Sequence, residues 1–264
     1  MILAASPWWT TVPSLGAALG YALLAGWSAR LGRGAISAIM LGVWLLHGLA
    51  LVSVLGVEPV RFGFATLLSV TAWLVFTVYS IETRLYPQLS TRWTLAGLGV
   101  PAVLLMLFFP GTPYPVLQSA WLPLHWALGM ASYGLVGVAV AHAWMMQRTE
   151  RLMRLGTPMG NALPLLALER LTFRFVLAAF VLLTMTLLAG WAFAVLLHSG
   201  GVGLTHKTVF TALSWAVLGV LLLGRRQWGW RGKLAVRMLY AAAGLLLLGY
   251  VGSRFVLEVV LQRA

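Results

Sequence analysis

The sequence predicts an all-α, polytopic membrane protein with about eight transmembrane helices and with both ends of the chain outside the cytoplasm. Three observations support this fold class. Hydrophobic residues make up 61% of the chain and charged residues only 9%, which leaves too little polar surface for a soluble globular domain. The apolar residues are gathered into eight segments. The basic residues between these segments are unevenly divided between the two sides of the membrane, and this asymmetry orients the helices.

Each apolar segment is close to the length of about 20 residues that crosses a bilayer. In chain order the segments are residues 13–29, 35–57, 62–81, 93–109, 123–146, 173–197, 206–223 and 234–257. Spans of this length use roughly 160 positions, so only short connections are left in a chain of 264 residues. We therefore expect residues 1–264 to form a single integral membrane domain.

The positive-inside rule gives the orientation. With the N-terminus outside, fourteen of the 18 Lys and Arg residues are cytoplasmic, and four (Arg61, Lys207, Arg254 and Arg263) are outside. The longest connection, residues 147–172, is then cytoplasmic; it is basic and interrupted by glycine and proline, which predicts a solvated loop near anionic lipid. Topology thus accounts for the net charge of +13, and no nucleic-acid partner is expected.

The composition also restricts the chemistry. The chain has no cysteine, which excludes disulfides, thiolate metal sites and thiol catalysis. It has no aspartate, and its five acidic residues are all glutamates without a spacing suited to paired-carboxylate catalysis. Gly-rich phosphate loops and His-Glu metal motifs are also absent from the sequence. We therefore expect a protein that is not an enzyme.

Histidines are the main candidate functional residues. In the predicted topology His125 opens the fifth helix, His198 follows the sixth and His206 opens the seventh, so all three lie at the outer surface. Neutral imidazoles from two helices are suited to ligating a metal ion or haem iron. The alternative is that these side chains only bind water and lipid headgroups. His47 lies mid-span, where a helix-to-helix hydrogen bond is the more common role, and the role of His142 near the inner face is left open.

A pair of charges ends the last predicted span. Arg254 and Glu258 are four residues apart, so they share a helix face and can pair. One interpretation is an interfacial pair that ends the span. The other is a cation that binds an acidic ligand group, such as a haem propionate.

Several stretches of the chain resemble the cytochrome c assembly superfamily (CcsA/CcmC-like), a group of haem-handling membrane proteins, and most closely its YpjD/HemX-like branch. The resemblance covers residues 58–262 and is carried by LHWALGMASYG around His125, LLTMTLLAGWAF, HKT at His206, GWRGKLAVR and LLLGYVGSRFVLE. It implies cytochrome c-type biogenesis, a multi-pass location in the bacterial cytoplasmic (inner) membrane, and a role for His125 as an outer ligand of haem iron.

The chain also departs from the family pattern. The family's tryptophan-rich outer loop is replaced by HSGGVGLTHKT, its inner histidine falls near Gly224, and its last outer histidine has no counterpart beyond Tyr250. The leading hypothesis is an outer haem pocket in which His125 and His206 bind the iron, Arg254 pairs with a propionate, and Trp126 and Trp121 form the walls.

Two other functions stay open at the level of the sequence. The first is a non-haem structural or regulatory subunit, an accessory to tetrapyrrole synthesis or transport that binds a membrane or cytoplasmic partner protein through residues 147–172. The second is a permease that uses His47, although one mid-membrane histidine makes a poor proton relay.

Overall fold

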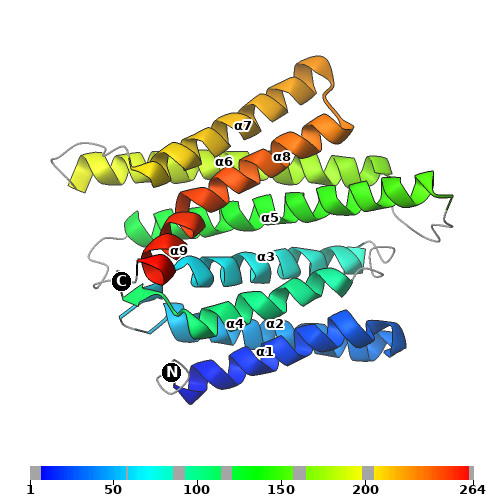
Figure 1. Cartoon of the computed structure of the whole chain (residues 1–264), viewed down its shortest axis with the longest axis vertical. Coiled ribbons are helices and arrows are strands. Elements are labelled where there is room, and N and C mark those ends of the chain that lie inside the picture. The colour runs from blue at the N-terminus through cyan, green and yellow to red at the C-terminus, as the bar shows by residue number, and fades with distance from the viewer. Residues whose placement is uncertain are drawn as a thin grey trace. The chain divides into compact units, whose positions relative to one another are not determined.

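A computed structural model of the chain describes residues 7–57, 59–85, 93–113, 121–156, 165–197 and 205–261. All eight predicted apolar segments are helical, which confirms the all-α, polytopic fold class (Figure 1). Seven helices in the described part are long and apolar enough to cross a membrane, and the fourth segment forms a shorter apolar helix over Ala96–Phe108. Glu58 and His198, both predicted to lie in outer loops, fall outside the described residues.

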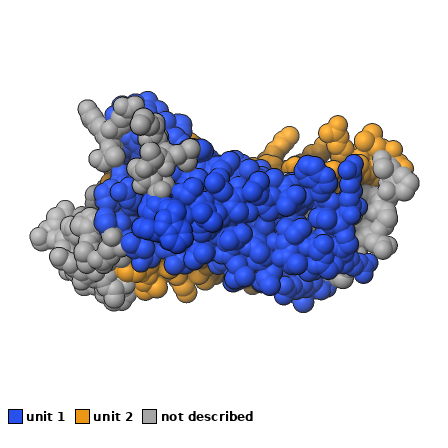
Figure 2. Space-filling view, turned by 90° about the horizontal axis from the view of Figure 1, so that it is seen from below, with its two compact units in different colours: residues 1–116, 254–264 blue, residues 117–253 orange. Residues whose placement is uncertain are grey.

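The chain divides into two compact units, shown in blue and orange in Figure 2. Unit 1 comprises residues 1–116 and 254–264, and unit 2 comprises residues 117–253. The last helical stretch belongs to both, because the boundary falls between Ser253 and Arg254. The expectation of a single domain over residues 1–264 stays a prediction.

Unit 1 is built from α1 (Trp8–Trp27), α2 (Arg33–Leu55), α3 (Phe64–Leu85) and α4 (Gly99–Phe108). Short 3₁₀ turns at Ser28–Arg30 and Trp93–Leu98 come before α2 and α4. The helices alternate in direction, and the ends of the chain marked N and C lie at the same end of this unit (Figure 1).

The core of unit 1 combines small and aromatic side chains. Gly20 lets α1 approach α2 closely, since a Cβ atom there would lie 2.2 Å from Val43 Cγ2, and Tyr21 packs edge-on against Phe76 of α3 at a centroid distance of 5.0 Å. The Tyr21 hydroxyl is hydrogen-bonded to Nδ1 of His47 at 2.8 Å, and Nε2 of the same ring is hydrogen-bonded to Ser69 Oγ at 2.9 Å. Both nitrogens of this fully buried histidine are therefore used to join α1, α2 and α3.

A two-stranded ribbon, which the sequence did not suggest, lies at the end of unit 1 that carries both chain ends (Figure 1). Strand β1 (Arg61–Phe62) pairs antiparallel with β2 (Thr112–Pro113). Gly63 and Gly111 allow the two backbones to approach, since a Cβ atom on Gly63 would lie 2.7 Å from Gly111 Cα. Gly111 also has a φ of +84°, which glycine adopts without strain.

Unit 2 contains α5 (Trp121–Arg154), α6 (Leu165–Leu197), α7 (His206–Trp228) and α8 (Gly232–Leu247). Its core comes from the apolar stripes of all four helices, for example Ala139, Leu183, Leu218 and Leu239. Polar side chains join the helices inside this core: Trp215 Nε1 donates to Thr184 Oγ1 at 2.8 Å.

The predicted loop at residues 147–172 is wrong over most of its length. Helix α5 continues to Arg154 and α6 already begins at Leu165, so the helices of 34 and 33 residues are longer than the roughly 20 residues that span hydrocarbon. The basic turns continue α5 because an exposed helix is stabilised by pairs four residues apart, here Glu150 with Arg154. The helix ends at Arg154, and Gly156, with a φ of +64°, closes its C-terminus two residues later.

Candidate functional site

His125 lies in the second turn of α5 and faces α6. Its Nδ1 atom is 3.0 Å from the backbone carbonyl oxygen of Thr186. Because a carbonyl oxygen can only accept, Nδ1 carries the proton and donates it to Thr186. In the neutral ring the lone pair then resides on Nε2, the tautomer that ligates a metal through Nε2 while the other nitrogen is held by a carbonyl.

A glycine on α6 provides the space for this ring. A Cβ atom on Gly190 would lie 3.0 Å from His125 Cε1, closer than ordinary van der Waals contact. Gly190 is four residues after Thr186, so both lie on the face of α6 that meets His125. The position of the imidazole is thus set by two neighbouring features of the same face of α6, the Thr186 carbonyl and the missing side chain of Gly190.

The Ser-Tyr pair of the MASYG stretch holds α5 against its neighbours. Ser132 Oγ donates to the Leu128 carbonyl at 2.8 Å and lies 3.5 Å from Thr186 Oγ1. The Tyr133 hydroxyl donates to the carbonyl of Leu246 on α8. Ser132 and Tyr133 therefore fix α5 between α6 and α8, and they support His125 without being ligands themselves.

The carbonyl that Tyr133 binds lies where α8 changes its geometry. Beyond Leu247 the helix continues as a π-helical turn, Leu248–Gly252, then one α-helical turn, α9 (Ser253–Phe255), and a second π turn, Val256–Val260. A π turn shifts the backbone hydrogen bonds by one residue, and such turns are frequent at functional sites.

His206 is the first residue of α7, as the sequence predicted, and its side chain is exposed. Thr205 precedes it as the N-cap and accepts from the Thr208 amide at 3.4 Å. Within the described part of the chain, no hydrogen bond or ring contact joins His206 to His125, and no group of three or more histidines and glutamates is suited to holding a metal ion. Shared ligation by His125 and His206 stays a prediction.

Arg254 and Glu258 belong to unit 1, where they hold the ribbon and α3. Arg254 Nη1 lies 3.5 Å from Thr112 Oγ1 of β2 and interacts electrostatically with the Glu258 carboxylate. That carboxylate also accepts from the backbone amide of Phe64, the first residue of α3. These contacts agree with the simpler interpretation, a pair that ends the span, and pairing of Arg254 with a propionate stays a prediction.

The other sequence candidates are placed less completely. Trp126 is partly buried on α5, next to His125. Trp121 begins the same helix, but its side chain and all of His198 lie outside what the structure describes. His142 is buried and stacks on Phe175 at a centroid distance of 5.2 Å, which gives it a packing role between α5 and α6.

At the opposite end of unit 2, the space beside Gly224, near which the family's inner histidine is predicted to fall, is filled. A Cβ atom on Gly224 would lie 2.1 Å from Cε3 of Trp230, and the Trp230 amide donates to the Gly224 carbonyl at 3.2 Å. Beside it, Glu169 of α6 pairs with Arg225 and lies 3.7 Å from Arg231 Nε. This end is therefore a structural junction.

Sequence reasoning found His125 but missed the residues that position it. Thr186 acts through its backbone, so its side chain gives no signal. Gly190 and Tyr133 lie inside LLAGWAF and MASYG, two stretches that carry the family resemblance. The stretches shared with the family therefore pointed to Gly190 and Tyr133, although the chemistry of a glycine or a tyrosine side chain alone did not.

Comparison with known proteins agrees with this architecture. The family described as cytochrome C assembly protein matches residues 34–261, a wider range than the predicted 58–262. A relative from Azospirillum brasilense, described as an uncharacterized 28.8 kDa protein in the nifR3-like 5′ region, is 32% identical over 216 residues, which is 75% of this chain and 76% of the relative. No solved structure matches.

A second relative identifies the branch and the location. Inner membrane protein YpjD of Escherichia coli K12 is 37% identical over 97 residues, which cover 37% of this chain and 36% of YpjD. Together with the apolar helices, this similarity makes the chain a YpjD-like, multi-pass protein of the bacterial inner membrane. On the family match over residues 34–261, the chain belongs to the cytochrome c assembly protein family, whose function in the membrane is related to haem.

Proposed function

We propose that the protein binds haem at the outer end of unit 2 through His125 and does not catalyse a reaction on it. The observation that carries the proposal is the hydrogen bond from His125 Nδ1 to the Thr186 carbonyl at 3.0 Å. It fixes the tautomer in which Nε2 can bind iron, and the helix-to-helix contact fixes the orientation of the ring. Family membership supplies the class of cofactor.

The arrangement around His125 fits a ligand of this kind. His125 is partly buried, so its ring lies at the edge of the helix pair and is accessible to a large planar group. Trp126 follows it and offers an aromatic surface, which suits the apolar face of a porphyrin. When bound, haem would supply the iron that accepts the Nε2 lone pair; the chain's own part is to hold and orient the imidazole.

The two remaining predicted contacts extend the proposal. His206, exposed at the start of α7, is the candidate for a second axial ligand. Pairing of Arg254 with a propionate is left as the expectation from the sequence, because in unit 1 this side chain contacts Thr112 and Glu258. Neither contact is needed for ligation by His125.

An absorption spectrum tests the proposal. Protein expressed with ample haem and purified in mild detergent should show a Soret band that His125→Ala abolishes or shifts. His206→Ala is the matched control, since it also removes one imidazole from a helix start at the outer side; it should shift the band only if His206 is the second ligand. Circular dichroism must show that both variants keep the wild-type helix content.

A colourless wild-type protein that takes up added haem no better than His125→Ala would refute haem binding. The chain would then be a structural or regulatory membrane subunit. In that case the exposed helix ends of α5 and α6, Gln147–Arg154 and Leu165–Thr172, would be the surfaces to test for a partner protein.

A further inference from the structure

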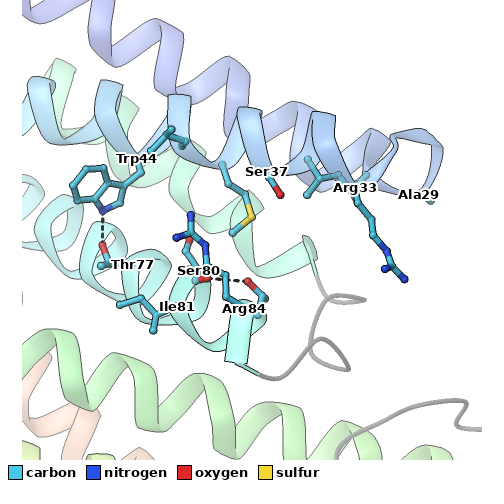
Figure 3. Close-up of a pocket in the computed structure, with 13 residues that line it drawn as sticks. Ala29, Arg33, Ser37, Trp44, Thr77, Ser80, Ile81 and Arg84 are labelled. Atoms are coloured by element: carbon cyan, nitrogen blue, oxygen red, sulfur yellow. Dashed lines mark hydrogen bonds between the residues drawn. The ribbon is translucent and has the colours of Figure 1, made fainter.

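Unit 1 contains a groove of about 720 Å³ between α2 and α3 that takes no part in the proposed haem site (Figure 3). The end of α1 and the turn at Ser28 and Ala29 close one side. The groove opens at the end of unit 1 that carries Arg33 and Arg84, which the charge distribution predicts to be cytoplasmic. At its other end the Trp44 Nε1 atom donates to Thr77 Oγ1 at 3.0 Å, which joins the two helices.

The polarity of the walls changes along the groove. Near the mouth, each basic residue is one turn from a serine, Ser37 on α2 and Ser80 on α3. Deeper in, the walls are apolar, with Met40 and Leu41 before Trp44. An amphiphile with a polar head and an apolar chain would match this order of side chains.

The length of the groove matches one leaflet of a bilayer. Arg33 and Trp44 are eleven residues apart on α2, and a helix rises about 1.5 Å per residue, so the groove is roughly 16 Å deep. One leaflet contributes half of a hydrocarbon core of about 30 Å. An acyl chain that starts at the interface would therefore end near Trp44.

The arginines at the mouth of the groove indicate which polar headgroup the amphiphile would carry. Within the described residues, neither Arg33 nor Arg84 forms an ion pair, and no carboxylate lines the groove. Figure 3 shows the Arg84 side chain on α3 directed inward beside Ser80, and the Arg33 side chain extending from α2 at the mouth, away from Trp44. Two guanidinium groups with nearby hydroxyls bind a phosphate diester well, because arginine donates in a planar fork.

We propose that this groove binds one anionic phospholipid from the leaflet at the basic end of unit 1. Its phosphate binds at the basic end of the groove, within reach of the flexible side chains of Arg33 and Arg84, and one acyl chain follows the groove toward Trp44. Basic pockets between transmembrane helices recognise anionic headgroups in this way. The proposal is independent of haem binding.

The experiment measures lipid retention. Wild-type protein is incorporated into bilayers of phosphatidylglycerol and phosphatidylethanolamine and extracted, and the lipids that stay bound are counted by native mass spectrometry. The wild type should retain one phosphatidylglycerol in preference to phosphatidylethanolamine. The double variant Arg33→Gln/Arg84→Gln should reduce that preference about ten-fold or more, because it removes the charge-assisted hydrogen bonds to the phosphate.

Arg148→Gln/Arg151→Gln is the matched control. It removes the same charge from exposed positions of α5 on the same predicted side of the membrane, but these arginines do not line the groove. Retention of this one lipid should change less than about two-fold, since neither arginine lines the groove that holds it. An equal loss in both double variants would show a general surface effect and overturn the proposal.

A steric variant tests the groove without changing its charge. Ser37→Phe places a ring inside the groove, so the bound lipid should be lost even if the arginine variant fails to fold. Unchanged retention in a folded Ser37→Phe protein would overturn the proposal. So would displacement of the lipid by glycerol phosphate, because the occupant would then be a soluble phosphate and not a lipid.

Discussion

Gly190→Ala tests whether the contact between α5 and α6 sets the position of His125. The new methyl group would lie 3.0 Å from His125 Cε1, whereas ordinary van der Waals contact begins at 3.4 Å. The imidazole must therefore move by roughly 0.4 Å or tilt. Since this methyl group would contact the ring from the same face of α6 as the Thr186 carbonyl, the ring would be pushed away from α6, which disturbs the 3.0 Å hydrogen bond that fixes the tautomer.

The expected energy has two opposing parts. Replacing glycine by alanine in a helix gains about 0.5 to 1 kcal/mol from the backbone. Overpacking a well-packed contact costs about 1 to 3 kcal/mol. We expect Gly190→Ala to lower the free energy of unfolding by about 0.5 to 2 kcal/mol, the difference between these two effects.

Gly129→Ala is the matched control on the facing helix. Its methyl group would lie 3.7 Å from Thr186 Cγ2, an ordinary contact, so only the helix gain of about 0.5 to 1 kcal/mol applies. Thermal unfolding in detergent should therefore move the two variants in opposite directions. Haem titration should show weaker binding to Gly190→Ala alone. Equal stability and equal haem affinity in the two variants would refute the role of Gly190 in placing the imidazole.

Three further predictions concern topology and stability. Reporter fusions after Arg151 and Arg231 should be cytoplasmic and a C-terminal fusion should be outside, as the fourteen-to-four charge distribution requires; the opposite result at any of these positions would reject the eight-span topology. Glu169→Gln should lower the free energy of unfolding by about 1 to 2 kcal/mol, since it weakens the partly buried ion pair with Arg225. Glu150→Gln is the control: its partner Arg154 is exposed, so the free energy of unfolding should change by less than about 0.5 kcal/mol. Gly63→Ala should destabilise unit 1 by about 1 to 3 kcal/mol in denaturation experiments, because its Cβ would lie 2.7 Å from Gly111 Cα. Gly97→Ala, whose Cβ would have its nearest contact at 3.4 Å, should be tolerated. Similar stability of the two variants would contradict the close approach of the backbones at the ribbon.

The fold was largely predictable because membrane helices leave a strong signal in sequence. Every apolar segment became a helix, since a backbone in hydrocarbon must satisfy its hydrogen bonds internally. The predictions failed outside the hydrocarbon, where water can satisfy the hydrogen bonds of the backbone. The helical extension of α5 to Arg154 depends on water-exposed ion pairs, and the β1–β2 ribbon depends on Gly63 and Gly111, which meet only in the folded chain.

The site was less predictable, because its geometry depends on atoms that sequence patterns do not distinguish. Chemistry identified His125 as a ligand candidate, but its tautomer follows from the carbonyl of Thr186. The role of His47 followed a general rule for intramembrane histidines, and its bonds to Tyr21 and Ser69 agree with that rule. The Arg254–Glu258 pair was predictable from spacing, whereas its contacts with Thr112 and Phe64 were not.

The packing of unit 2 restricts how haem could be held. The resemblance predicts the family's inner histidine near Gly224, whose carbonyl accepts from the amides of both Gly229 and Trp230 to close α7. The Trp230 ring fills the space that a side chain at Gly224 would need. His142 is also unsuited to ligation, because it is buried against Phe175. Among the described histidines of unit 2, His125 and His206 are therefore the two whose side chains are not buried, so these are the described histidines that could hold haem in this unit.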